Sequence, residues 1–151
     1  MFNNLLRIFK SKENKESVQF FKEGVIEVAC IFIRVGKLDN HLATIEKEKI
    51  KALLIKRFDL DSDILNAILT KAEAVEVSIN DNVQLTKKIK QHINFEERFD
   101  LLKDIWEIIL ADKIKTDEEE SYMRLLCNLL GLSDKDNALA RKDVLKAHEK
   151  K

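Results

Sequence analysis

Apolar residues recur along this chain with the spacing of amphipathic helices, most clearly between Phe95 and Ser133. Asn94 followed by Glu97 is a capping box, which predicts that a helix begins there. The apolar positions that follow recur every three or four residues, as one face of a helix requires. They are Phe99, Leu102, Ile105, Trp106, Ile109 and Leu110. We expect this helix to end near Asp112.

A second helix is predicted after a short acidic loop. Thr116 and Glu119 form another capping box, so this helix should begin at about Asp117. Gly131 suits the left-handed position after a helix, with Leu132 as the accompanying hydrophobic contact. Two helices joined by so short a loop are expected to pack as an antiparallel hairpin. The predicted buried face of the second helix consists of Tyr122, Met123, Leu125, Leu126, Leu129 and Leu130.

Further helices are predicted on both sides of this segment. The stretch Val18–Val35 is apolar on nearly all sides, so it belongs in the centre of the fold, and Gly36 ends it. N-caps for the later helices are Thr44, Asp61 or Ser62, Asp81 and Ser133. Their predicted inward residues include Ile50, Leu53, Leu54, Phe58, Ile64, Leu65, Ile68, Ala72, Leu85, Ile89, Leu139, Val144 and Leu145.

Composition agrees with an all-α protein. The 151 residues include no proline and only three glycines, and 36% of them are charged. Such a chain is expected to fold as one compact helical bundle of about seven helices. The formal net charge is zero, so nothing attracts the chain as a whole to nucleic acid, and no nucleic-acid partner is expected.

The two halves of the chain resemble each other. Each contains a long apolar helix, an acidic loop, an amphipathic helix and a capped turn. The pattern predicts two helical hairpins related by a pseudo-twofold axis, unless two leucine-rich helices match by coincidence. The gap-free alignment places Leu53, Leu54, Phe58, Leu60 and Asp61 on Leu125, Leu126, Leu130, Leu132 and Ser133.

Residues 1–12 form a separate basic amphipathic segment, with Phe2, Leu5, Leu6 and Phe9 on one face. Such a segment can bind an anionic membrane surface. A frayed terminus, or a helix docked on the protein's own surface, is the alternative, because so short a helix is marginal alone.

The cellular compartment is predicted from the cysteines and the apolar runs. Cys30 and Cys127 lie in apolar helical stretches, as buried thiols of a reducing cytoplasm do. The run Val25–Val35 is too short to span a bilayer, and the N-terminus lacks the features of a signal peptide. We expect a cytoplasmic protein that can be peripheral to the inner membrane.

More specific motifs accompany the helical pattern. The second half contains Trp106-Glu107-Ile108-Ile109-Leu110-Ala111-Asp112, then Glu119 and Arg124, then Leu129-Leu130-Gly131-Leu132-Ser133. The first half contains Gly36-Lys37-Leu38-Asp39, then Glu46, then Arg57-Phe58-Asp59-Leu60-Asp61. In these motifs the chain resembles the tellurite-resistance TerB-like family of bacterial helical domains. The resemblance covers about Val18 to Lys146, and residues 18–148 are assigned to one TerB-like domain.

The resemblance implies a helical interaction module whose two acidic loops hold divalent cations, Ca²⁺ or Mg²⁺. The implied ligands are Asp39 and Glu46 in the first loop and Asp112 and Glu119 in the second. The family is linked to stress-response systems and membrane-associated complexes, which implies a protein partner that the sequence does not identify. Val35 stands where the family has an acid in the first loop, and Lys113 replaces a glycine in the second. We expect the second loop to be the better site.

The residues themselves support two interpretations of the acidic loops. Asp112 ends a helix, where the macrodipole disfavours a negative charge, and hard cations bind carboxylate and carbonyl oxygens. On the other hand, acids in a first helical turn are stabilising without any ligand, and Glu119 can be occupied in its capping box. A structural adaptor that binds no ion is therefore the alternative function.

No motif in the sequence predicts catalysis. The chain contains no nucleophile elbow, glycine-rich phosphate loop or CxxC motif. His41, His92 and His148 are too far apart in the sequence to indicate a zinc site. A metal-dependent hydrolase needs bridging carboxylates that neither loop clearly provides, so it is the least favoured function. We expect no enzymatic activity.

Overall fold

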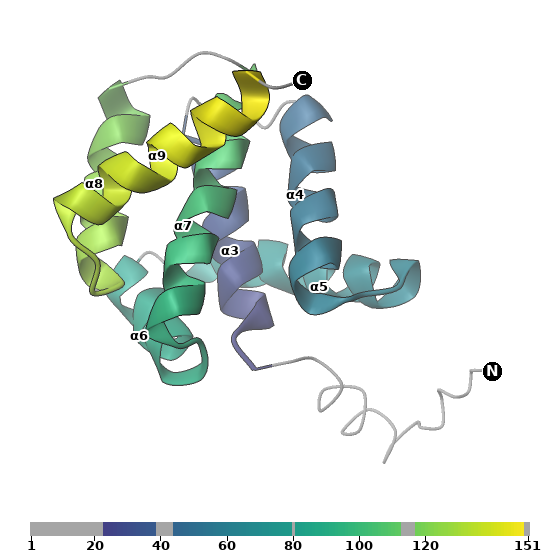
Figure 1. Ribbon diagram of the computed structural model, residues 1–151. Helices are drawn as coiled ribbons and strands as arrows, with labels where there is room; N and C mark the ends of the chain where they lie inside the picture. The colour runs from purple at the N-terminus through teal and green to yellow at the C-terminus, as the bar shows by residue number, and fades with distance from the viewer. Residues whose placement is uncertain (1–22, 39–43, 80, 113–116, 150–151) are drawn as a thin grey trace.

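The computed structural model describes residues 23–38, 44–79, 81–112 and 117–149 (Figure 1). Within them lie seven α-helices, one 3₁₀ turn and no strand, which confirms the all-α prediction. The elements are α3 (Val25–Gly36), α4 (Thr44–Phe58), α5 (Ser62–Ser78), α6 (Asn82–His92), α7 (Phe95–Ile109), η1 (Leu110–Asp112), α8 (Asp117–Leu129) and α9 (Asp134–Glu149). Among these helices, none has the length and apolar character needed to cross a bilayer. The amphipathic segment 1–12 lies outside the described residues.

Helix α3 is the centre of the bundle, as its apolar sequence predicted. It packs against α4, α5, α6 and α7, and it is buried on nearly all sides (Figure 1). The predicted start at Val18 is not observed, since 18–22 lie outside the described residues and the described helix begins at Val25. Gly24 precedes it with φ of 90°, a left-handed conformation that a helix interior cannot contain. Gly36 is the last residue of α3, as expected.

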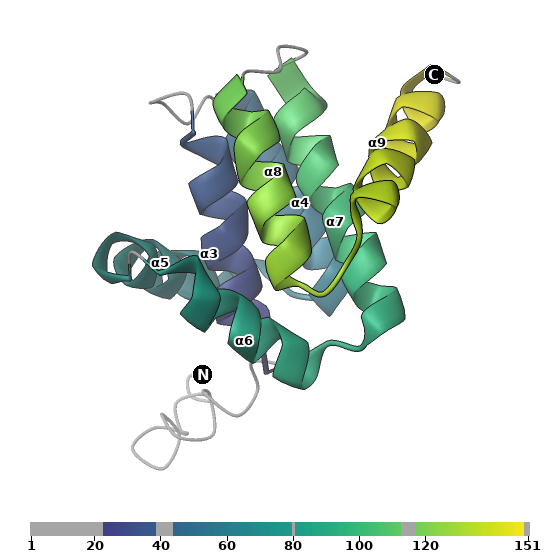
Figure 2. The same cartoon turned by 90° about the vertical axis from the view of Figure 1, so that its left-hand side faces the viewer.

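The chain consists of two similar halves joined by α6. In the first half α3 packs closely on α5, and in the second α7 packs closely on α9. The middle helix of each half, α4 or α8, runs back in the opposite direction (Figures 1 and 2). Consequently α4 and α8 begin at the same end of the molecule, where α3 and η1 end. This end, at the top of both views, is called the loop end below.

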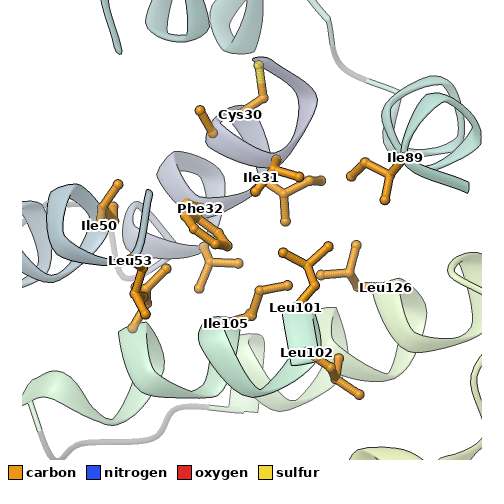
Figure 3. Close-up of a cluster of buried hydrophobic side chains, with 14 of the residues drawn as sticks. Cys30, Ile31, Phe32, Ile50, Leu53, Ile89, Leu101, Leu102, Ile105 and Leu126 are labelled. Carbon is orange, nitrogen blue, oxygen red and sulfur yellow. The ribbon is translucent and has the colours of Figure 1, made fainter. Parts of the chain in front are cut away.

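Helices α7 and α8 run antiparallel, as predicted, but they do not pack closely on each other as the two helices of a hairpin would. Helix α9 packs on both α7 and α8, and α8 also contacts α6. The side chain of Leu126 on α8 still reaches Leu101 on α7 (Figure 3). The predicted packing of α8 directly on α7 is therefore wrong, because α6 and α9 are the helices against which α8 mainly packs.

Side chains from both halves meet in one core. Phe32 of α3 lies beside Leu53 of α4 and Ile105 of α7, while Ile31 lies between Ile89 of α6 and Leu101 (Figure 3). The predicted core residues Trp106 and Leu126 are buried, with 2% and 1% of their surface exposed. The two halves therefore share one hydrophobic core.

The predicted inward faces of α8 and α9 are wrong at two leucines. Leu125 is 47% exposed and Leu139 is 46% exposed. A helix buries one stripe, and the buried stripe of α8 runs through Glu119, Met123, Leu126 and Cys127. In α9 the buried residues are instead Ala140 and Val144.

Burial also changes the alignment of the two halves. By buried position, the matching pairs are Glu46 and Glu119, Ile50 and Met123, Leu53 and Leu126, and Leu54 and Cys127. The gap-free alignment instead pairs buried Leu53 with exposed Leu125, so it is one residue out of step along these helices.

The turns after α4 and α8 do follow the gap-free alignment. Asp59 and Gly131 both have left-handed backbones, with φ of 54° and 80°. Asp61 accepts a hydrogen bond from the Ile64 amide at 2.9 Å, and Ser133 exchanges hydrogen bonds with Asp136. The predicted caps at these positions are confirmed, whereas Thr44 is already the first residue of α4 rather than its cap.

Candidate functional site

Two of the four predicted cation ligands lie among the described residues. Glu46 and Glu119, called the first-turn glutamates below, belong to the first turns of α4 and α8. Each is only 1% exposed, although glutamate is among the residues least often buried. The other two predicted ligands cannot be placed, since Asp39 and the side chain of Asp112 lie outside the described residues.

The position of the first-turn glutamates explains how a carboxylate can be buried there. Burial of an ionised carboxylate is unfavourable unless hydrogen bonds or charges compensate it. The first turn of a helix offers free backbone N–H groups and the positive end of the helix dipole. Both carboxylates interact with other groups of the protein, so neither is isolated.

Tertiary packing brings the two predicted sites to one end of the bundle. Helix α4, which carries Glu46, packs against η1, the turn whose last residue is Asp112. The start of α8, with Glu119, lies at the same loop end (Figure 2). The sequence predicted two separate loops, one in each half, and did not predict that α4 of one half packs on η1 of the other.

A third carboxylate near this end, that of Glu107 on α7, already has two partners, His148 and Lys49. Its Oε1 lies 2.9 Å from His148 Nε2 and 3.5 Å from Lys49 Nζ. Partial burial raises its pKa, but these two partners outweigh that effect and leave the pKa below its usual value. This cluster ties α9 to α7 and α4. The sequence analysis missed it, because the three residues are far apart along the chain.

The described residues alone do not form a complete cation site. Among them, no group of three or more His, Cys, Asp and Glu side chains is placed to hold a metal ion. Each loop contributes one buried glutamate from the described part of the chain. A hard cation there would draw its other oxygen ligands from the two aspartates, loop carbonyls and water.

Buried polar contacts elsewhere have structural roles that the sequence did not indicate. Arg34 donates hydrogen bonds to Glu76 at 3.2 Å and Asn82 at 2.9 Å, which fastens α3 to α5 and α6. Arg57 donates to Asp104 at 2.7 Å and joins α4 to α7 across the two halves. Burial raises the pKa of Asp104, although the Arg57 guanidinium acts in the opposite direction.

The cysteines are structural thiols, as expected. Cys30 Sγ donates to the Ala72 carbonyl at 3.4 Å, and Cys127 Sγ to the Ser133 carbonyl at 3.1 Å. Burial raises the pKa of Cys30 to about 12 and that of Cys127 to about 11. Both are therefore thiols near neutral pH, and neither has the thiolate character of a nucleophile or zinc ligand.

Comparison with protein families matches residues 25–142 to the family described as tellurite resistance protein TerB. The chain belongs to the TerB family. The matched region begins with the first residue of α3 and ends within α9, so it includes both halves and the loop end. Searches of curated proteins and of solved structures give no match. The membership confirms the family resemblance and the helical fold.

Proposed function

We propose that this TerB-family chain is a helical interaction module that binds a divalent cation, Ca²⁺ or Mg²⁺, at the loop end. Glu119 and Asp112 are the side-chain ligands of the stronger site. Glu46 and Asp39 are those of a weaker site in the first half. The bound cation stabilises the loop end, where the module contacts a protein partner.

One observation carries this proposal: a glutamate is buried at the same position of both halves. A glutamate that only stabilised its helix through the dipole could do so while exposed to water. Two buried carboxylates at one end of the bundle bring oxygen atoms of the kind that hard cations prefer into a region of low dielectric. Charge there attracts a cation more strongly than it would at the surface.

A structural adaptor without an ion is the second candidate. It is supported by the interactions that both glutamates already make and by the lack of a three-ligand group among the described residues. In that function the two carboxylates only close the first turns of α4 and α8.

Contact with a membrane is a separate part of the proposal. It rests on the sequence of residues 1–12, whose apolar face holds Phe2, Leu5, Leu6 and Phe9. Co-sedimentation with anionic vesicles tests it, by comparing the full chain with a chain that begins at Lys15. Equal sedimentation of the two proteins would contradict it.

Thermal unfolding in Ca²⁺, Mg²⁺ or Mn²⁺ tests the cation site. A ligand that binds only the folded state stabilises it by about 2.7 kcal/mol at one hundred times its dissociation constant. We expect the metal-dependent rise to be lost in Asp112→Asn and Glu119→Gln, and largely kept in Asp39→Asn and Glu46→Gln. Glu118→Gln is the matched control, because Glu118 is an exposed acid of the same turn.

The outcomes separate the two candidates. No rise with any of the three ions at millimolar concentration would favour the adaptor. A rise that survives Asp112→Asn would place the stronger site elsewhere, and a rise lost equally in Glu118→Gln would indicate diffuse charge attraction.

A further inference from the structure

A cavity of about 480 Å³ lies where α7, α8 and α9 meet, and it is called the α9 pocket below. These three helices are grouped at the left of Figure 1. The volume falls in the range of small-molecule sites, roughly 300–1,000 Å³. Trp106 lines it from α7, Arg124 from α8, and Asn137 and Arg141 from α9. The first-turn glutamates do not line it, so it is distinct from the proposed cation site.

Two contacts hold an arginine in a defined place at this pocket. The Trp106 indole Nε1–H donates a hydrogen bond to Asn137 Oδ1 at 2.9 Å, which fixes the ring between α7 and α9. The Arg141 guanidinium lies 5.7 Å from the centroid of that ring, within the range of a cation–π contact. An arginine held by a rigid ring loses little entropy when it binds a further group.

The Nε–H group of Arg141 has no acceptor among the described residues, although it is buried. A buried N–H without an acceptor is unfavourable, so a small rotation toward an acceptor in the pocket would be stabilising. Every other arginine of the described ranges donates to an oxygen atom of the protein; these are Arg34, Arg57, Arg98 and Arg124.

The charges around the pocket limit what it can accept. Arg124 is mostly exposed and makes a long contact of 3.4 Å with Glu120, so it can turn toward a ligand. Glu120 and Asp134 line the pocket beside the two arginines, which makes the formal charge of these four side chains zero. A polyanion would meet two carboxylates as well as two cations. A ligand with one carboxylate and an adjacent hydrogen-bond donor suits both kinds of side chain, since the arginines bind the carboxylate and the acids accept from the donor.

We propose that the α9 pocket binds a small monocarboxylic acid that carries a neighbouring donor, of the α-amino or α-hydroxy acid class. Arg141 takes the carboxylate through two parallel N–H···O bonds, the geometry in which a guanidinium binds it most strongly. Arg124 adds a second positive charge. The ammonium or hydroxyl group of the ligand donates toward Glu120 and Asp134. A carboxyl-terminal peptide end presents the same carboxylate without the adjacent ammonium.

The single tryptophan of the chain makes the binding measurable. Full-length protein is titrated with glycine, alanine, glycolate, acetate, a peptide with a free terminal carboxylate and inorganic phosphate, at constant ionic strength. Trp106 fluorescence and the indole N–H signal in NMR report on the pocket. We expect saturable changes with the amino or hydroxy acids and weaker binding of acetate, the peptide and phosphate.

Substitutions test whether Arg141 is responsible for the binding that Trp106 reports. Arg141→Lys keeps the charge but loses the planar fork, and we expect it to weaken binding about tenfold or more. Arg124→Gln should weaken it less, because its donor is exposed. Lys142→Gln removes one positive charge from an exposed neighbour on α9 that does not line the pocket, and it should bind like the parent. Circular dichroism confirms that each variant is folded.

Several results would overturn the proposal. One is the absence of saturable change with any of the acids at tens of millimolar. Phosphate or the peptide end binding more tightly than the amino and hydroxy acids would show that the pocket serves another class of ligand. An equal loss in Lys142→Gln and Arg141→Lys would show attraction by general charge. An unchanged affinity in both Arg141→Lys and Arg124→Gln would place the ligand elsewhere.

Discussion

The two halves of this bundle have equivalent turns and helix–helix contacts, but they form them with different side chains. The first half places a left-handed aspartate, Asp59, after its middle helix, while the second uses Gly131. The first half fastens its third helix through Glu76 on α5, which pairs with Arg34 on α3 and with Lys37 directly after α3. The second half reverses the signs, with Glu107 on α7 and His148 on α9. The repeat therefore preserves the positions of contacts while their chemistry varies.

Their surroundings differ as well. Helix α3 is enclosed by four neighbouring helices, while α7 packs mainly on α9, α3 and α4. Enclosure on every side requires apolar residues all around α3, whereas α7 keeps charged residues such as Asp100 and Lys103 on its open face. The difference shows that the first helix of one half is the central helix of the bundle, whereas the first helix of the other half keeps one face open to solvent.

The largest expected effect concerns the buried face of α8, which determines how the halves correspond. Leu126→Ala should lower the free energy of unfolding by about 2–5 kcal/mol, because Leu126 is buried between α8 and α7. Leu125→Ala should change it by less than about 0.5 kcal/mol, because Leu125 is half exposed. Denaturant unfolding measures both. Similar losses in the two variants would restore the gap-free alignment along the helix.

The turn residues should respond with opposite signs. Gly131→Ala is expected to cost about 1–2 kcal/mol, because an alanine at φ of 80° is strained and its Cβ would lie 3.2 Å from Arg98 Nη1. Asp59→Gly relieves the same strain in the first half and should stabilise the protein by about 0.5 kcal/mol. Thermal unfolding of the two variants checks this. A loss of stability in Asp59→Gly would mean that the aspartate side chain has a role beyond the backbone.

The smallest expected effect is a difference in pH dependence between two contacts: that of Glu76 with Arg34 and Lys37 in the first half, and that of Glu107 with His148 in the second. The pKa values of Glu76 and Glu107 are both lowered, with burial opposing and the cationic partners prevailing. Both carboxylates therefore stabilise the fold above the ordinary glutamate pKa, and this stabilisation is lost as the pH falls through their lowered values. From pH 5.5 to 8 both stay ionised.

Histidine is the residue type whose charge ordinarily changes between pH 5 and 8, whereas lysine stays charged, so over that range we expect a pH dependence of the contact between α7 and α9 alone. The stability lost in His148→Gln should be larger at pH 5.5 than at pH 8, by about 0.2–1 kcal/mol for a partly exposed pair. Lys37→Gln should cost the same at both values. Hydrogen exchange at the end of α9 gives a local measurement. A pH-independent His148→Gln would show that the imidazole acts only as a neutral hydrogen-bond partner.

Parts of the candidate site could be read from the sequence. The capping box at Thr116 predicted that Glu119 is a first-turn residue, since a cap depends on neighbours within a few positions, and the family resemblance singled out Glu46. Their burial could not be predicted, because an acid in a first turn is normally exposed. No pattern in the sequence predicted the α9 pocket. Trp106 was predicted only as a core residue, and Arg141 lies against it from a different helix.

The sequence by itself determined the helices, the caps at Asp61 and Ser133, the central position of α3 and the family. All of these depend on spacing within one or two turns, which local chemistry dictates. Tertiary structure decided the rotation of α8 that buries Leu126 and exposes Leu125. It also decided the packing of α4 on η1 and the meeting of Trp106, Arg124 and Arg141. Those outcomes depend on which neighbours a helix face meets after the chain has collapsed. Because several apolar faces can satisfy one amphipathic pattern, only the packed bundle selects among them.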